Sequence, residues 1–222
     1  MKAHKPQRDL ASLSLCPEFE FTKWNEQHNR LSRKKTKLKT FIEIGCADFD
    51  TLVPLAAKGG WSGWCVEPIP EHAATLREAS RGLPVGIVEA AISSFDGHVT
   101  MAVGGGQDWA RGASHVMDSH HSGAKMLEHP DNVALGLKIA EIEVQSIKLD
   151  TFLLEHDITE VDFMKIDVEG HEMEILNHYS WDVKPKIIKC EHKHLSGNTL
   201  DKMLKRQGYS IFVETDDIYA IL

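Results

Sequence analysis

Several features are scarce or missing in this 222-residue sequence, and each absence excludes a class of protein. There are four cysteines and no C-x-x-C pair, so neither a zinc ribbon nor a dithiol redox motif is predicted. No apolar run approaches the roughly 20 residues of a membrane span, and no signal-peptide core is visible. A cytoplasmic protein without membrane contact is therefore expected, with Cys46, Cys65 and Cys190 as reduced, small buried hydrophobes.

A net positive charge is also missing. The formal net charge is -8, so binding to nucleic acid, which usually needs a basic face, is not favoured. Segment 30–39 is the exception, because it holds six Lys or Arg residues and no acid. That segment is either a solvated approach to the first strand or a patch that contacts phosphate or a partner. The 42% hydrophobic and 26% charged composition is typical of one globular domain.

Strand and helix signals alternate from residue 40 onward. The predicted strands are 40–44, 64–67, 85–91, 99–103, 141–147, 163–167 and 186–190. The predicted helices are 51–58, one opened by Pro68 and Pro70, 150–156, 172–177 and 200–206. A closing hairpin joins 209–213 to 218–222. This alternation predicts a doubly wound α/β fold, with a mostly parallel sheet and a C-terminal antiparallel hairpin.

Two segments fall outside the alternation. Residues 1–39 are polar and basic and predict an N-terminal helical extension, which leaves 40–222 as the main domain. Residues 104–140 lose periodicity and are rich in Gly, His, Ser and Asp, as is typical of a lid or binding loop. An ordinary surface loop is the equal alternative. The polar and aromatic side chains of this segment are Trp109, Arg111, Ser114, His115, His120 and His121.

The ends of the first two predicted strands suggest a ligand site, because ligands of open α/β sheets bind where strand order reverses. Gly45 permits a close backbone approach, and the small residues Cys46 and Ala47 keep the space open. Glu67 ends the second strand, where an acid can accept hydrogen bonds from both hydroxyls of a ribose. No G-x-G-x-x-G is present to cradle a pyrophosphate. These features predict a nucleoside ligand without phosphates, of which S-adenosylmethionine (SAM) is the common one.

Six runs in this order resemble the FkbM-type SAM-dependent methyltransferases: FIEIGCADFDT, CVEPIPEHAATL, VEAAISSFDG, SIKLDTFL, VDFMKIDVEGHEMEIL and KIIKCEH. The most specific is K-I-D-V-E-G-x-E, which begins at Lys165, followed by the E-P-x-P run at 67–70. The resemblance implies a class I methyltransferase (Rossmann-like) fold and SAM as cofactor. It also implies methyl transfer to a hydroxyl of a sugar-like or polyketide-like acceptor. Many members read D-I-G-A-N-x-G after the first strand; here Glu43 replaces the Asp, and Cys46, Ala47 and Phe49 replace A, N and the second G.

The resemblance also assigns roles to residues. Glu43, Gly45 and Ala47 are expected to line the methionine part of SAM. Glu67 is expected to hold the ribose, and Asp167 to close the pocket under the sulfonium. The adenine is expected beside Ala90 and Ala91, with Ile92 as an apolar contact. The full set of candidate cofactor-binding residues is Glu43, Gly45, Cys46, Ala47, Asp48, Glu67, Pro68, Ala90, Ala91 and Ile92.

Methyl transfer to an alcohol needs alignment of the reacting atoms and a base or a metal ion. The candidate catalytic residues are Asp167, Glu169 and His171, and further candidates after strand ends are Glu191, His192 and His194. In the alternative interpretation Asp167 and Glu169 only cap the next helix, and His171 faces solvent. The alternating His192 and His194 suit a metal, although no metal site is predicted.

Two other functions stay open. A metal-dependent hydrolase would use the cluster of Asp, Glu and His residues, but it gives Glu67 no role. A non-catalytic nucleoside-binding module is favoured by the altered loop after Gly45. For the enzyme, the expected partner is a small-molecule or saccharide hydroxyl acceptor, and the sequence predicts no particular oligomeric state.

Overall fold

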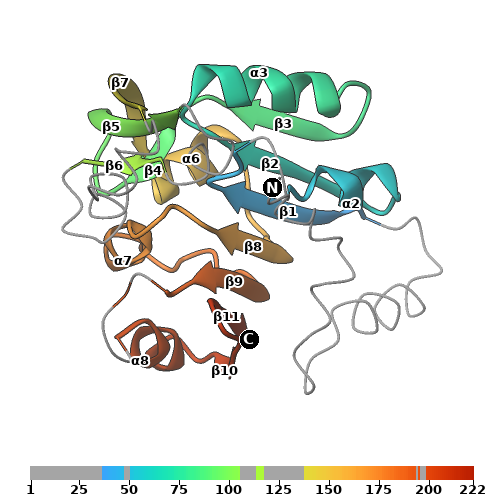
Figure 1. The fold of residues 1–222 in the computed structure, drawn as a ribbon. Coiled ribbons are helices and arrows are strands. Elements are labelled where there is room, and N and C mark those ends of the chain that lie inside the picture. The colour runs from blue at the N-terminus through green and yellow to red at the C-terminus, as the bar shows by residue number, and fades with distance from the viewer. Residues whose placement is uncertain (1–36, 48–50, 106–113, 118–137, 194, 196–198) are drawn as a thin grey trace, which may run out of the picture.

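The computed structural model describes residues 37–47, 51–105, 114–117, 138–193, 195 and 199–222. Its main sheet has seven strands (Figure 1). In spatial order they are β10 (Ser210–Val213), β11 (Asp217–Ile221), β9 (Ile187–Glu191), β8 (Phe163–Ile166), β1 (Lys39–Ile44), β2 (Trp61–Val66) and β3 (Val85–Val88). Six of these strands run in the same direction, and β11 alone runs in the opposite direction. This order confirms the predicted class I methyltransferase fold with its C-terminal antiparallel hairpin.

Helices cover both faces of this sheet, which explains why its central strands are apolar on both sides. One face packs against α2 (Val53–Ala57) and α3 (Pro70–Ala79) through a cluster around Phe41. The other face packs against α6 (Leu149–Glu155), α7 (Glu172–Asn177) and α8 (Thr199–Arg206) around Ile42. No described helix is both long and apolar enough to span a membrane.

Strand order reverses beside β1. The chain proceeds outward from β1 to β2 and β3, and it later returns to the opposite side of β1 as β8 and then β9 (Figure 1). The carboxyl ends of β1, β2 and β8 therefore meet at the position where doubly wound folds bind ligands.

A second, four-stranded sheet was not foreseen from the sequence. Its order is β4 (Ala91–Ser93), β7 (Lys138–Lys148), β5 (Gly97–Gly105) and β6 (His115–Val116). The single strand predicted over 85–91 is wrong, because β3 ends at Val88, opposite the last residue of β2. The chain then leaves the main sheet, and β4 pairs in parallel with β7.

The segment 104–140 is more ordered than predicted where the structure describes it. β5 continues to Gly105 and pairs with β7 from Lys138, and β6 pairs with β5 inside the expected loop. Antiparallel pairing needs only backbone groups, so a Gly-rich strand gives no side-chain periodicity to detect. Residues 106–113 and 118–137 lie outside the described residues, as does nearly all of the 1–39 extension.

Candidate functional site

Glu67, at the end of β2, turns toward the loop that follows β1. The Ala47 backbone N–H donates to Oε2 of Glu67 at 2.8 Å, and the Ile69 N–H donates to Oε1 at 2.9 Å. Ala47 has a positive φ of 46°, and the Glu67 residue is only 3% exposed. A carboxylate offers about four acceptor positions, so two protein donors leave acceptor capacity for a ligand. The turn after β1 and the acid after β2 therefore face each other.

Gly45 makes this turn possible by its lack of a side chain. Its φ is +77°, and a Cβ there would lie 1.9 Å from the backbone oxygen of Asp167. The Gly45 N–H donates to the Val66 oxygen at 3.1 Å, and the Asp167 N–H donates to the Ile44 oxygen at 3.0 Å. The turn is thus joined to the ends of both β2 and β8, and any larger residue would force the strand ends apart.

Glu43 on β1 is a fully buried carboxylate with several protein partners. Its Oε2 accepts from the Thr51 hydroxyl and the Leu52 N–H, each at 2.7 Å, and from the Cys65 thiol at 3.7 Å. Its Oε1 pairs with Nζ of Lys165 at 3.0 Å. These contacts fix the segment entering α2 and balance the charge. In the described residues the carboxylate is engaged by protein rather than open to a ligand.

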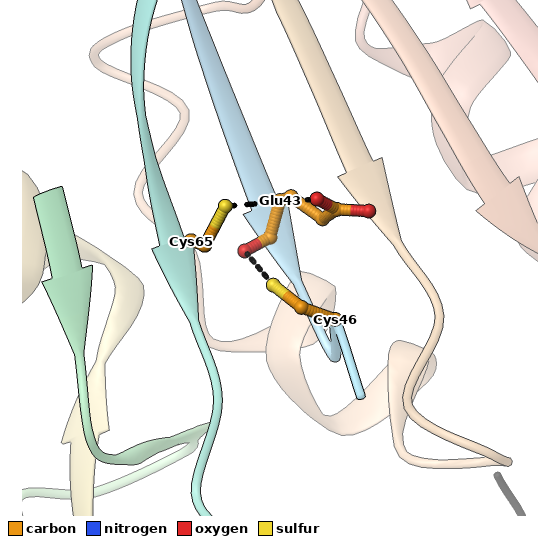
Figure 2. Close-up of side chains that lie close together, drawn as sticks. All are labelled: Glu43, Cys46 and Cys65. Atoms are coloured by element: carbon orange, nitrogen blue, oxygen red, sulfur yellow. Dashed lines mark hydrogen bonds between the residues drawn. The ribbon is translucent and has the colours of Figure 1, made fainter. Parts of the chain in front are cut away.

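Two thiols lie beside Glu43, one bonded to its backbone oxygen and the other to its carboxylate (Figure 2). Cys46 donates to the backbone oxygen of Glu43 at 3.3 Å, and Cys65 donates to its side chain. The three potential ligand atoms lie within 4.8 Å of one another, which is compatible with a bound metal. The Lys165 ammonium already occupies one side of the group, and burial raises the pKa of the Cys46 thiol well above its usual value. A protonated Cys46 thiol beside a Glu43 carboxylate that is paired with Lys165 is therefore favoured over a metal site.

A second acidic group lies at the ends of β8 and β9. The carboxylates of Asp167, Glu169 and Glu191 have oxygens within 4.8 Å of one another. Burial, followed by the charges of Asp167 and Glu169, raises the pKa of Glu191 to about 8. Lys193 opposes this rise, since its Nζ bonds to Glu191 and lies 3.5 Å from Glu169. The structure thus brings together two predicted catalytic residues and one further candidate.

The alternative interpretation expected His171 to face solvent, but the structure buries it. It is 6% exposed and lies at the N-cap position of α7. Its Nε2 lies 2.9 Å from Oγ of Ser93 on β4. This contact ties the β8–α7 loop to the strand that carries Ala91 and Ile92, the residues predicted beside the adenine. In sequence the two partners are 78 positions apart, so the burial of His171 could not be inferred locally.

Among the described residues, no histidine belongs to the group of close potential ligands that Asp167, Glu169 and Glu191 form. His192 follows β9, but its Nε2 lies 3.3 Å from the Glu214 oxygen in the C-terminal hairpin. His115 is buried on β6, and the Ser114 hydroxyl accepts from the Gly104 N–H. Ala90, Ala91 and Ile92 are buried, and Pro68 is half-buried. The predicted residues outside the described part of the chain are Asp48, Trp109, Arg111, His120, His121 and His194.

One cavity of about 400 Å³ lies at the opposite end of the sheet. Its lining comes from the start of β1, β2 and β3 and from the segment after α6, including Trp64 and His156. The His156 ring stacks on Trp64 with centroids 3.9 Å apart. Ligands of doubly wound sheets bind at the carboxyl ends of the strands, so this cavity is not the cofactor site.

Sequence reasoning missed several residues of the site. Lys165 and Glu172 lie within the quoted K-I-D-V-E-G-x-E motif but received no role. Lysine is seldom buried unless it pairs with an acid, so the position of Lys165 inside an apolar strand could have predicted an acidic partner such as Glu43. His72 on α3 is also buried, with Nδ1 3.5 Å from Oε1 of Glu67. Lys193 had no sequence signal beyond its position two residues after Glu191.

A family model described as the methyltransferase FkbM domain matches residues 41–211. No curated protein matches the chain. A solved structure, the precorrin-6y C5,15-methyltransferase from Geobacter metallireducens GS-15, is similar at 15% identity and a TM-score of 0.39, covering 85% of this chain and 80% of that chain. Because the family match spans most of its length, the chain belongs to the FkbM methyltransferase family.

Proposed function

We propose that this chain uses SAM as its methyl donor and transfers the methyl group to a hydroxyl oxygen of a sugar-like or small natural-product acceptor. The observation that carries the proposal is the Glu67 carboxylate, held by the Ala47 and Ile69 amides at the strand-order reversal. Its remaining acceptor positions suit the two hydroxyls of a ribose. The described turn residues 45–47 carry no basic side chain, which suits a nucleoside without phosphates.

SAM, when bound, supplies a methyl group on a positively charged sulfonium, so the protein has to hold and align the reactants. Glu67 binds the ribose and thereby sets the direction of the rest of the cofactor. The backbone of the 45–47 turn lies between Glu67 and the end of β8, where the acidic group begins. This arrangement supports a methyl donor placed between the turn and the carboxylates.

The acidic group supplies the proton acceptor that an alcohol nucleophile needs. As the oxygen–methyl bond forms and the sulfur–methyl bond breaks, the hydroxyl proton passes to a carboxylate, for which Glu191 is the best candidate. Its pKa of about 8 lies near neutral pH, where general bases work most effectively. Asp167 and Glu169 are the two carboxylates that, with burial, set this value.

The hydrolase alternative receives no comparable support from the described residues. Its cluster needed histidines together with acids, but His171 lies against Ser93 and His192 against the C-terminal hairpin. Both groups of close potential metal ligands in the described chain lack histidine.

Binding is tested by calorimetry on the full chain with SAM and with its demethylated product. We expect binding by the wild type and at least about tenfold weaker binding by Glu67→Gln, because hydrogen bonds to a charged acceptor are lost. Glu89→Gln is the matched control, since Glu89 is exposed and pairs with Arg77 on the surface. If the wild type does not bind SAM, the cofactor proposal is wrong. If Glu67→Gln binds SAM as tightly as Glu89→Gln does, Glu67 does not hold the ribose.

Turnover is tested separately with a panel of hydroxylated acceptors and SAM carrying a labelled methyl group. Label on an acceptor oxygen supports the proposal, and label on nitrogen or carbon contradicts the proposed oxygen specificity. SAM binding without transfer to any acceptor favours the nucleoside-binding module. A chelator is included, and loss of activity in its presence would show that a metal assists the base.

A further inference from the structure

Glu172, the first residue of α7, holds the loop that carries the candidate base group. It is 1% exposed, and its Oε1 accepts from the Val168 N–H at 3.1 Å and the Gly170 N–H at 3.2 Å. One carboxylate oxygen thus accepts hydrogen bonds from two backbone amides of the segment between β8 and α7. The Glu172 side chain reaches back into the loop that precedes its own helix.

The loop needs such support because its backbone is unusual. Glu169 has a φ of +54° and Gly170 a φ of +108°, two consecutive residues in the left-handed region. A residue with a side chain persists there only when surrounding contacts over-determine its conformation. The two amides that Glu172 binds lie on either side of Glu169, so the Glu172 carboxylate fixes the backbone conformation of Glu169.

The consequence reaches the acidic group directly. Asp167 directly precedes Val168, and Glu169 lies between the two residues whose amides Glu172 binds. The carboxylates of Asp167 and Glu169 both lie close to that of Glu191. We propose that Glu172 is a positioning residue for methyl transfer, which holds Asp167 and Glu169 opposite Glu191. This inference rests on the proposed function of the same site.

Glu172 can accept the two amide hydrogen bonds without carrying a negative charge. Burial raises its pKa to about 7, although the bonds from the Gly170 and Val168 amides oppose this rise. Its other oxygen, Oε2, is buried without a hydrogen-bond partner in the described structure. Glutamine keeps the accepting oxygen at the same reach, whereas methionine keeps the shape and removes the acceptor. The pair Glu172→Gln and Glu172→Met therefore isolates the acceptor.

The first test uses the free protein and needs no acceptor. Glutamate carboxyl carbons are labelled with ¹³C, and the Glu191 resonance, assigned with Glu191→Gln, is followed by NMR from pH 5 to 10. If Glu172→Met releases the loop, Asp167 and Glu169 move away and the pKa of Glu191 falls by about one unit. Glu172→Gln and the control Glu174→Met, on the same helix turn, keep the wild-type titration. An unchanged Glu191 titration in Glu172→Met overturns the inference.

The second test separates positioning from folding by comparing cofactor affinity with turnover. We expect Glu172→Met to lower kcat by about 100-fold, the effect of a displacement of about 1 Å. Kd for SAM should rise far less, by at most about fivefold, because Glu67 and the 45–47 turn still hold the cofactor and only Asp167, expected under the sulfonium, is displaced. Glu172→Gln restores kcat to within a few-fold of the wild type. Equal losses in kcat and SAM affinity, or no rescue by glutamine, overturn the inference. Failure of the wild type to bind SAM would instead contradict the proposed function, while the NMR titration would still test the positioning.

Discussion

Two acidic sites at the carboxyl edge of the main sheet differ in how their charge is balanced. Glu43 is a single carboxylate matched by a single ammonium, Lys165, and it also accepts from a hydroxyl, an amide and a thiol. The acidic group of Asp167, Glu169 and Glu191 places three carboxylates near the ammonium of Lys193. Among the described residues, the first site has as many ammonium groups as carboxylates, whereas the second has more carboxylates than ammonium groups.

This difference in charge indicates which site has a structural role and which is suited to catalysis. A buried carboxylate whose lone pairs are filled by protein donors fixes the strand ends and has little capacity left for a reactant. A group with excess negative charge raises the pKa of one of its members, and such a shifted acid is suited to take up a proton near neutral pH. Strand β8 contributes to both sites, because Lys165 pairs with Glu43 and Asp167 follows the strand end.

The largest expected effect comes from breaking the balanced site. Lys165→Met removes one partner of a buried ion pair and leaves the Glu43 charge uncompensated. We expect a loss of about 3–5 kcal/mol in the free energy of unfolding, measured by urea denaturation. Adding Glu43→Gln to Lys165→Met should recover part of this loss. Lys205→Met, which breaks an exposed pair with Asp201, is the control and should cost far less. A loss below 1 kcal/mol would show that Glu43 is not balanced mainly by Lys165.

The second prediction concerns the pH dependence of stability. The folded-state pKa of Glu191 is raised to about 8, so the folded state keeps a proton that the unfolded state releases above about pH 4.3. Stability from this group is therefore full at low pH and is lost as pH rises from about 4.3 through 8. The advantage of Glu191→Gln over the wild type in unfolding free energy should grow between pH 5 and 8, on the order of 3 kcal/mol. A difference that is flat across this range would contradict the raised pKa.

A third, smaller effect is expected on catalysis at the site with excess acid. Glu191→Gln removes the proton acceptor, and we expect kcat to fall about 100-fold with little change in Kd for SAM. In the wild type, kcat should rise with pH through about 8, because only the ionised Glu191 accepts a proton. Steady-state kinetics from pH 6 to 9 measures both. A variant that keeps the wild-type pH profile would assign the base to another residue.

The elements of the fold could be predicted because their signals are local. The helix predicted over 172–177 coincides with α7, and the hairpin and the parallel order followed from apolar runs separated by turn residues. The second sheet could not be predicted, since periodicity identifies a strand but not its partner. The 85–91 run was divided between two sheets because β2 ends opposite Val88.

The site divides in the same way. Gly45 and Glu67 could be singled out because each carries a signal at a strand end, and the structure places them across one turn. The state of Glu43 depends on Lys165, 122 positions away, and the burial of His171 depends on Ser93, 78 positions away. Such contacts exist only after folding, so residue type and spacing could indicate candidates but not which of them protein partners engage.

The smallest expected effect tests whether Glu43 is saturated. The Cys65 thiol is its weakest donor, at 3.7 Å, and three stronger partners remain when this thiol is removed. Cys65→Ala should therefore lower the unfolding free energy by about 1 kcal/mol, the loss of a small buried group and a weak hydrogen bond. The same urea denaturation as for Lys165→Met measures it. If Cys65→Ala costs as much as Lys165→Met, the thiol is an essential partner of the carboxylate, and the contrast between the balanced site and the site with excess acid no longer holds.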